Sequence, residues 1–377
     1  MQVDFLIIGA GMAGLSLCAR LAGQASVAVV DKLSWQELSA QISPRAMSSP
    51  VTDGGAAKSL SDLSRYFLAH HNFSQPRASL YAGALGQEGL LRQWQRRLLY
   101  LGEQAQDISL EQVAVLAPAL RVENLAGALL LESSLEMNVL AMRDWLIAQT
   151  RAKGAHIVCG AATKQAYFQA GKWIVKLENG QVIHANVLIN AAGVQANHVA
   201  EQCGVAPQNL IFSERLCFLF NIDPAEEQAF QPAVLGVDGC YAFRFVQDQL
   251  YLHSAYGAAQ NSTTQQQVRQ MAQIELAYST FQLESTSFIR LRSPVCTWSE
   301  RTCDSQDGQC VMGWEPGIRP FFWFTAFGRT AVQSLPSASE LASGLLLRQP
   351  LSGELTQVSL PSMQPGRRQV SQGDWRV

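Results

Sequence analysis

Three glycines near the start of the chain, Gly9, Gly11 and Gly14, have the spacing of a phosphate-binding turn. Gly9 would make the tight turn, Gly11 would let the backbone approach a pyrophosphate, and Gly14 would let a helix pack on the preceding strand. The free N–H groups and the positive dipole end of that helix would face the phosphates. Asp31, about twenty residues further on, could accept a hydrogen bond from a ribose hydroxyl. This chemistry binds a dinucleotide.

Apolar runs surround the turn in the order needed to position it. Residues 5–8 suit a buried parallel strand, and residues 27–30 suit a second strand that ends at Asp31. Between them, residues 15–21 have the apolar spacing of a helix. This context favours a bound dinucleotide over a helix–strand turn that merely needs glycine.

The position of the turn favours FAD over NAD. The motif starts at residue 9, and no second glycine-rich fingerprint follows it in the 377 residues. A simple NAD dehydrogenase could look the same, so this alternative stays open on the turn alone.

Composition restricts the classes of partner and site. The chain is 48% hydrophobic and 15% charged, which is typical of a globular protein, and its length suggests two domains. A net charge of −2 gives no reason to expect nucleic acid as a partner. The eight cysteines form no C-x-x-C pair and the six histidines do not cluster with them along the chain. We therefore expect reduced thiols and no metal site.

The apolar N-terminal stretch could be mistaken for a signal peptide. However, Asp4 precedes it, no lysine or arginine does, and the glycines of the turn interrupt it. No later stretch reaches the roughly eighteen apolar residues of a membrane span. We expect a cytoplasmic protein, with membrane association and oligomeric state left open.

Hydrophobic periodicity predicts the remaining elements and an interleaved domain order. Helices are predicted over residues 59–73, 87–100, 139–152, 264–278 and from the end of the last strand through 347. Strands are predicted over residues 157–159, 173–177, 182–183, 186–190, 211–222, 241–246, 250–253, 288–291, 311–312 and 321–324. The predicted nucleotide-binding segments are 1–80, 139–205 and 305–377, and the predicted substrate-domain segments are 81–138 and 206–304.

Several motifs in this order resemble the D-amino-acid oxidase and glycine oxidase family, and most of all its D-arginine dehydrogenase branch. The resemblance covers nearly the whole chain. Besides the glycine turn and Asp31, it rests on residues 43–48, 190–193, 297–298, 307–308, 312–313, 321–323 and Gly328. It implies non-covalent FAD and an α/β fold, in which a strand-rich α+β substrate domain is inserted into a Rossmann-like FAD-binding domain of the glutathione-reductase type.

The resemblance also implies cofactor positions residue by residue. The pyrophosphate and ribose positions are Gly9, Gly11, Met12, Ala13, Gly14, Asp31 and Lys32. The loop along the extended chain of the flavin is Ser43, Arg45, Ala46, Met47 and Ser48, and a second phosphate-side turn is Ala192 and Gly193. The turn facing the flavin pyrimidine is Gly328, Arg329, Thr330, Ala331 and Val332. A helix that begins there would also stabilise negative charge on a reduced flavin.

Three residues are implied on the substrate side. Arg215 lies where the similar dehydrogenase has a substrate-facing arginine, whose planar fork suits a carboxylate. Tyr241 matches a tyrosine that closes over the substrate, and Arg301 lies near the family's carboxylate-binding arginine. The alternatives are a surface arginine at a strand edge for Arg215 and an ordinary core-edge aromatic for Tyr241.

Two positions depart from the family pattern. The family arginine would fall at Thr302, so Arg301 comes one residue early, and Glu300 replaces the usual glycine before it. A shift of one residue changes the face of a strand, so Arg301 needs a compensating bulge to reach the flavin. Arg329 is large where the backbone usually passes close to the ring. Since the pocket residues of the D-arginine enzyme are also missing from residues 49–54, arginine specificity is not carried over.

The resemblance implies oxidation of a small amine or amino acid, such as a D-amino acid or a glycine-like compound. Hydride would pass from the α-carbon to flavin N5, and the imine would hydrolyse to a keto acid and ammonia. A cation must then face the substrate carboxylate, and we rank Arg215 first, Arg301 second and Arg329 third. A flavin dehydrogenase of a 2-hydroxy acid and a flavin-binding protein with little catalysis stay as alternatives.

Overall fold

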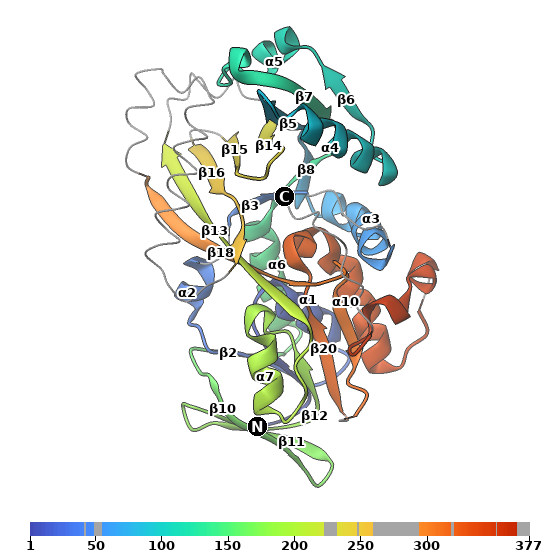
Figure 1. Cartoon of the computed structure of the whole chain (residues 1–377). Helices are drawn as coiled ribbons and strands as arrows, with labels where there is room; N and C mark the ends of the chain where they lie inside the picture. The colour runs from blue at the N-terminus through green and yellow to red at the C-terminus, as the bar shows by residue number, and fades with distance from the viewer. Residues whose placement is uncertain are drawn as a thin grey trace.

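A computed structural model describes residues 1–40, 43–48, 55–221, 232–246, 249–258, 294–317, 320–351 and 353–367. Two large sheets lie in the two halves of the molecule, with β12 and β20 in the lower half of Figure 1 and β5, β7 and β15 in the upper half. The helices α1, α6 and α10 lie with the lower sheet (Figure 1). This arrangement is the predicted α/β fold of a Rossmann-like part combined with a strand-rich part.

The first sheet contains eight strands and carries the glycine turn. Its order is β10-β11-β12-β1-β2-β9, with β20 added beside β12 and β19 beside β20. The strands around β1 run parallel, and α1 (Met12–Leu21) connects β1 to β2, as the sequence predicts. Its strands are β1 (Gln2–Ile8), β2 (Val27–Asp31), β9 (His156–Cys159), β10 (Thr163–Gln169), β11 (Lys172–Leu177), β12 (Val182–Asn190), β19 (Val311–Trp314) and β20 (Phe321–Thr325).

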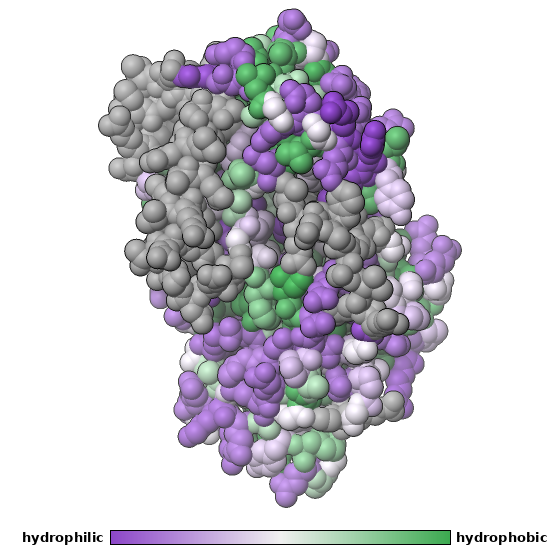
Figure 2. Space-filling view, in the orientation of Figure 1, coloured by the Kyte–Doolittle hydropathy of each residue, from purple (hydrophilic) through white to green (hydrophobic). Residues whose placement is uncertain are grey.

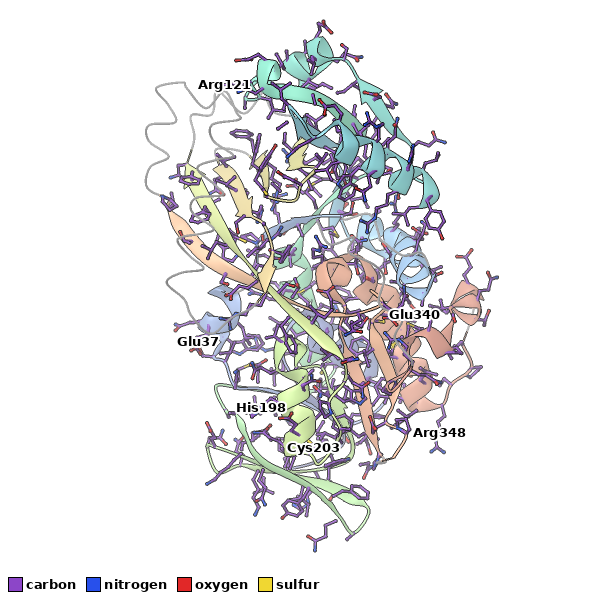
Figure 3. All side chains as sticks on the ribbon, in the orientation of Figure 1. Glu37, Arg121, His198, Cys203, Glu340 and Arg348 are labelled. Carbon is purple, nitrogen blue, oxygen red and sulfur yellow. The ribbon has the colours of Figure 1, made fainter. Side chains whose placement is uncertain are left out.

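Both faces of this sheet are buried at its central strands β1, β2 and β20, which explains their unbroken apolar runs. Ile7 and Val29 pack on one face with Leu17 of α1 and Leu335 of the C-terminal helix. On the other face, buried side chains of the same strands pack against α7 (Ala196–Gln202), which carries His198 in Figure 3.

The C-terminal helix α10 (Ala331–Leu347) lies against α1 and against α3 (Gly55–His70). Most of its residues are buried, and Arg20 of α1 pairs with Glu340 at 3.1 Å. Arg348, labelled in Figure 3, takes a left-handed conformation with φ of 55° and ends the helix. The other helices of this half are α2 (Trp35–Ala40) and α6 (Val139–Ala152).

The second sheet contains nine strands in the order β17-β13-β16-β15-β14-β5-β7-β6, with β18 paired to β13. One face packs in an apolar cluster that includes Val113 of α5 (Leu110–Leu116), and α4 (Glu88–Tyr100) lies near β5 and β7. The strands are β5 (Ser79–Ala84), β6 (Ala105–Ile108), β7 (Leu125–Leu131), β13 (Leu210–Asn221), β14 (Ala233–Gly236), β15 (Tyr241–Val246), β16 (Gln249–Ser254), β17 (Gly257–Ala258) and β18 (Cys296–Ser305).

A small third sheet joins the two halves. Its order is β3-β8-β4, with β3 (Arg45–Met47), β8 (Leu135–Asn138) and β4 (Ser74–Pro76). The sequence predicts a loop over residues 45–47. In the structure these residues form β3, which pairs with β8 so that Ala46 lies opposite Met137.

The helix prediction over residues 139–152 is confirmed to the residue, while residues 182–183 and 186–190 form one strand and not two. Strand β18 is absent from the predicted elements because its sequence is largely polar. The predicted helix over 264–278 and strand over 288–291 lie outside the described residues. The predicted domain boundaries and cytoplasmic location stay predictions.

Hydrophilic residues cover much of the visible surface of the lower half, and apolar residues gather near the centre of the view (Figure 2). Among the helices that the structure describes, none combines the length and apolar character needed to cross a bilayer.

Candidate active site

The glycine turn of residues 9–14 is tightly closed and leaves open space above its centre. Gly9 has a φ of +110°, and a Cβ added there would lie 2.4 Å from the carbonyl oxygen of Ala191. A Cβ on Gly14 would lie 1.8 Å from the carbonyl oxygen of Gly9, so α1 packs directly on the turn. A Cβ on Gly11 would meet no atom within 4 Å. The turn thus has the close packing and the free space that a pyrophosphate requires.

The start of α1 is free of competing groups. The N-cap residue is Gly11, which has no side chain to bond the first N–H groups of the helix. The first turn also contains no acidic residue. Gly193, which follows β12 and begins a short 3-10 helix, also has open space around its Cβ position and a φ of +54°. Met12 and Ala13 form the first helical turn, so their N–H groups are placed to bind phosphate oxygens.

Asp31 holds the turn together in addition to its expected role. One carboxylate oxygen accepts from the backbone N–H of Ala10 at 2.7 Å, and the other accepts from that of Leu33 at 2.9 Å. A carboxylate can accept about four hydrogen bonds, so capacity remains for a ribose hydroxyl. Lys32 beside it is exposed.

The hydroxyls of the predicted cofactor loop are used within the protein. Ser43 donates to the carbonyl oxygen of Arg45 at 2.8 Å, and Ser48 accepts from the N–H of Leu135 at 2.8 Å. Ala46 and Met47 form the half-buried strand between them. These residues therefore shape the loop, and its strand β3 lies at the edge of the small sheet and pairs with β8.

A buried carboxylate behind this loop, Glu136 on β8, is surrounded by arginines. Arg45, Arg77 and Arg244 approach it at 3.6, 3.3 and 3.4 Å. Burial lowers the pKa of Arg244 to about 10, although the charge of Glu136 opposes this shift. Three guanidinium groups around one carboxylate give the loop a positive surrounding that favours an anionic ligand. The sequence gives no signal for this group, since its members lie on four separate strands or strand flanks.

The turn that precedes α10, η4 (Gly328–Thr330), lies against β18. A Cβ on Gly328 would fall 1.6 Å from a carboxylate oxygen of Asp304, so the backbone approaches this strand closely. Thr330 caps α10 without a side-chain bond to the helix N–H groups, and its hydroxyl donates to the carbonyl of Phe327 at 2.9 Å. Ala331 and Val332 open the helix, whose N-terminal dipole end therefore lies at this turn.

One face of the second sheet is turned towards η4. Asp304 and Glu300 share a face of β18, and Arg215 of β13 lies opposite Glu300 in the strand pairing. The guanidinium of Arg215 lies 4.6 Å from the ring centre of Tyr256, and that of Arg329 lies 5.2 Å from the same ring. The structure thus brings the sheet residue and the turn residue together at Tyr256, which the sequence analysis missed.

Arg215 is paired inside the protein. Its Nη2 and Nε lie 2.6 and 2.8 Å from one carboxylate oxygen of Glu300. The alternative of a surface arginine is wrong for this residue, since only 20% of its side chain is exposed. Arg329 is exposed, and no described acidic residue forms an ion pair with it.

The expectation for Arg301 is corrected by the strand register. β13 and β18 pair from Leu210 with Ser305 to Leu219 with Cys296 without a shift, so the compensating bulge is missing. Arg301 therefore points to the face opposite Glu300, where its Nε lies 3.1 Å from Glu214. Its side chain is 53% exposed.

The expectation for Tyr241 is corrected by the alternation of side chains along its strand. On β15 the side chains of Ala242 and Arg244 share the face of His253, so Tyr241 points to the other face. It packs there in the apolar cluster with Phe218, and burial raises its pKa. The alternative of a core aromatic describes this residue.

Three side chains on the η4-facing side form a further cluster. The pairing of β13 with β16 places Cys217 opposite His253, and ligand atoms of these residues and Glu300 all lie within 4.8 Å of one another. Thiol, imidazole and carboxylate are metal-ligand types. However, Arg244 donates to Nε2 of His253 at 3.1 Å, so the ring proton lies on Nδ1, which faces the Cys217 sulfur at 3.2 Å. We therefore assign this cluster to hydrogen bonding.

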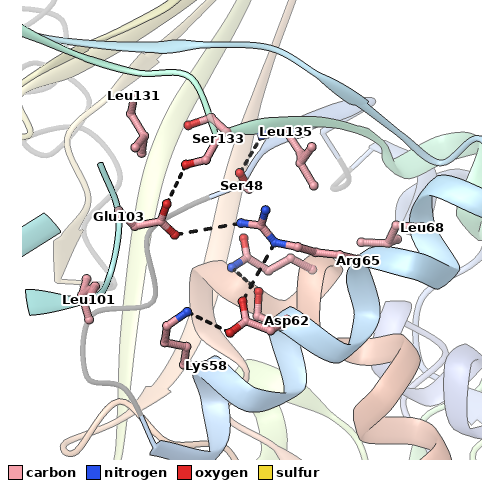
Figure 4. Close-up of a pocket in the computed structure, with 13 residues that line it drawn as sticks. Ser48, Lys58, Asp62, Arg65, Leu68, Leu101, Glu103, Leu131, Ser133 and Leu135 are labelled. Carbon is pink, nitrogen blue, oxygen red and sulfur yellow. Dashed lines mark hydrogen bonds and ion pairs between the residues drawn. The ribbon is translucent and has the colours of Figure 1, made fainter. Parts of the chain in front are cut away.

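A separate small pocket lies beside Ser48, between α3 and the second sheet (Figure 4). Arg65 bridges Asp62 and Glu103 across it at 3.9 and 4.0 Å, and Ser133 donates to Glu103 at 2.6 Å. Its volume of about 20 Å³ is close to the room that one water molecule needs. This pocket is too small to hold a substrate.

Comparisons with known proteins agree with this geometry. A family model described as FAD dependent oxidoreductase (DAO) matches residues 4–345. Glycine oxidase from Geobacillus kaustophilus is similar in structure, with a TM-score of 0.77, 16% identity and coverage of 95% of this chain and 98% of that one. FAD-bound L-α-glycerophosphate oxidase from Mycoplasma pneumoniae has a TM-score of 0.77, 14% identity and coverage of 92% and 95%. Iminodiacetate oxidase from Chelativorans sp. BNC1 has a TM-score of 0.68, 15% identity and coverage of 94% and 98%.

These similarities do not single out the D-arginine dehydrogenase branch that the sequence motifs resemble. The structural likenesses describe the fold, and the family match covers most of the chain. Together with the open cradle above Gly11, they establish the cofactor. The chain belongs to the DAO family of FAD-dependent oxidoreductases, and FAD is its cofactor.

Proposed function

We propose that the protein oxidises a small amine or amino acid at its C–N bond. The products would be reduced FAD and an imine, which water hydrolyses to a carbonyl compound and ammonia. Two structural neighbours whose names state a related substrate, glycine oxidase and iminodiacetate oxidase, support this substrate class.

The observation that carries the proposal is the group of charges around Tyr256. Arg215, Glu300 and Arg329 lie on the face of the second sheet that is turned to η4 or on η4 itself. Groups of both signs at one place suit a zwitterion, and an amino acid is a zwitterion at neutral pH. Because Glu300 already neutralises Arg215, we now rank Arg329 first as the partner of a substrate carboxylate.

Bound FAD would supply the acceptor for a hydride. The chain contributes binding and orientation: Arg329 would fix the carboxylate through charge-assisted hydrogen bonds, and Tyr256 would hold Arg329 by its ring. The start of α10 would favour negative charge beside η4. A zwitterion must lose its ammonium proton before the hydride leaves, whereas an amine that binds in its neutral form needs no strong base.

Oxidation of an alcohol is a second candidate, since a glycerophosphate oxidase is as similar in fold as the glycine oxidase. Matched pairs separate the two: D- and L-alanine against D- and L-lactate, and glycine against glycolate, with glycerol 3-phosphate added. Each compound is mixed anaerobically with the holoenzyme while the flavin absorbance is followed. Bleaching by amino compounds supports the proposal, and bleaching by hydroxy compounds alone contradicts it.

A further inference from the structure

The two carboxylate oxygens of Glu300 have different surroundings. Oε2 accepts from Nε and Nη2 of Arg215 at 2.8 and 2.6 Å and from the thiol of Cys217 at 3.7 Å. Within the part of the chain that the structure describes, no hydrogen bond or ion pair reaches Oε1. The side chain is 25% exposed, so Oε1 is the oxygen left for a ligand.

A chain of donors behind Glu300 fixes this asymmetry. Arg244 donates to Nε2 of His253, Nδ1–H of His253 donates to the Cys217 sulfur, and the thiol donates to Oε2. Burial lowers the pKa of His253 and raises that of Cys217 to about 12, so both groups are neutral. Each of the three hydrogen bonds therefore has one donor and one acceptor, and the chain that they form ends at Oε2 of Glu300.

We propose that Oε1 of Glu300 binds the amino group of the substrate and selects amino compounds over carboxylates that lack an amine. This inference rests on the proposed function and adds the residue that would recognise the nitrogen. Oε1 of this partly buried side chain can accept further hydrogen bonds, and an ammonium or amine N–H supplies one. Arg329, against the same Tyr256 ring as Arg215, would bind the carboxylate of that molecule. His253 and Cys217 are positioning residues in this account.

The chain provides a matched control for Glu300. Glu214 pairs with Arg301 at 3.1 Å one position along the same two strands, but on the opposite face. Glu214→Gln therefore removes a similar charge pair without changing the face turned to η4. Glu300→Gln removes the anionic acceptor while nearly keeping its shape.

Binding can be measured without turnover by using 2-aminoisobutyrate, which has no hydrogen on its α-carbon. Isobutyrate serves as the matched carboxylate without the amine. Calorimetry on the FAD-loaded enzyme gives the ratio of the two dissociation constants. The wild-type protein and Glu214→Gln should prefer 2-aminoisobutyrate by about tenfold to a hundredfold, and Glu300→Gln should lose this preference.

Two outcomes would overturn the inference: a wild-type protein without this preference, or a Glu300→Gln protein that retains it. If Glu300→Gln fails to fold because Arg215 is left unpaired, the double variant Arg215→Gln/Glu300→Gln removes both charges and should also lose the preference. The comparison stays valid because both probes carry a carboxylate. Since these ligands are not oxidised, a failure of the proposed function appears separately, in the flavin-bleaching assay.

Discussion

Arg215 directs both Nη2 and Nε at the same oxygen of Glu300, at 2.6 and 2.8 Å. The arginine on the predicted strand is therefore neutralised by the residue that replaces a family glycine. The position of a charged side chain on a strand face, and not its presence in a motif, decides which arginine can meet a substrate. This pair changes the ranking of the arginines that could bind a substrate carboxylate, and it adds the carboxylate of Glu300 to the site.

The first prediction compares Arg301 with Arg329. Arg301→Ala should change kcat/KM by less than about twofold and the free energy of unfolding by at most about 1 kcal/mol, because the Arg301 side chain of its pair with Glu214 is about half exposed. Arg329→Ala should raise KM by about tenfold or more, through loss of a charge-assisted bond. Steady-state kinetics on the substrate found by the bleaching assay tests both. Equal effects of the two substitutions would contradict the account.

The second prediction concerns the cradle above Gly11. Gly11→Val should abolish FAD retention, because its methyl groups occupy the place of the pyrophosphate. Gly89→Val on α4 is the control, since a Cβ there also meets no atom within 4 Å. The measurement is the ratio of flavin to protein absorbance after purification, with circular dichroism to verify folding. Retention of flavin by Gly11→Val would place the cofactor elsewhere.

The third prediction concerns Asp31. Asp31→Ala should weaken FAD binding by about 1.5–3 kcal/mol, the range for a hydrogen bond to a charged group. The same change removes the acceptor of the Ala10 and Leu33 N–H groups, so the apoprotein should also lose stability. Titration of the apoprotein with FAD and thermal unfolding of the apoprotein separate these effects. An unchanged FAD affinity would rule out the ribose contact.

The fourth prediction tests the contact between η4 and β18. Gly328→Ala should destabilise the protein and weaken FAD binding, because the added Cβ meets Asp304 at 1.6 Å. Gly353→Ala is the control, since Gly353 has a similar φ of +57° but open space around it. Both variants bear the backbone cost of about 1–2 kcal/mol, and the difference in their free energies of unfolding measures the clash. Equal destabilisation would mean that the turn does not rest on Asp304.

The fifth prediction concerns pH. Burial holds the pKa of His253 well below its ordinary value of 6.5, and Arg215 and Arg244 act in the same direction. As the pH falls below about 6.5, His253 binds a proton in the unfolded chain but stays neutral in the folded chain. The free energy of unfolding therefore decreases towards lower pH. The melting temperature of His253→Gln should therefore fall less between pH 7 and pH 5.5 than that of the wild type. Parallel pH profiles would show that His253 is not buried in neutral form.

The sequence predicted the cofactor half of the molecule well because its signals are local. The glycine spacing and the apolar runs around it depend on neighbours along the chain, and β1, α1 and β2 form as predicted. Arg301 and Tyr241 were misplaced because their faces depend on strand register, which resemblance to a motif does not give. A stricter reading of alternation along β13, with Leu216 and Phe218 on the face opposite Arg215, could have indicated the polar face.

The residues that gather at Tyr256 could not be found from spacing. Glu300 and Arg215 are 85 positions apart and meet through the pairing of β13 with β18, and β18 itself is too polar to be predicted as a strand. His253 joins Cys217 through another strand pairing. Which of these residues are neighbours is known only from the pairing of the strands in the second sheet.

Ammonia release in a single anaerobic turnover decides whether this protein oxidises amines. The holoenzyme is mixed with a primary amine or primary amino acid that bleaches its flavin, and the ammonia formed is quantified against the FAD reduced. We expect about one ammonia per flavin, because each substrate molecule gives one hydride with its two electrons to one FAD and leaves one imine to hydrolyse. Flavin reduction without ammonia, or a panel of amines and amino acids that leaves the flavin oxidised, would contradict the claim that this protein is an amine-oxidising flavoenzyme.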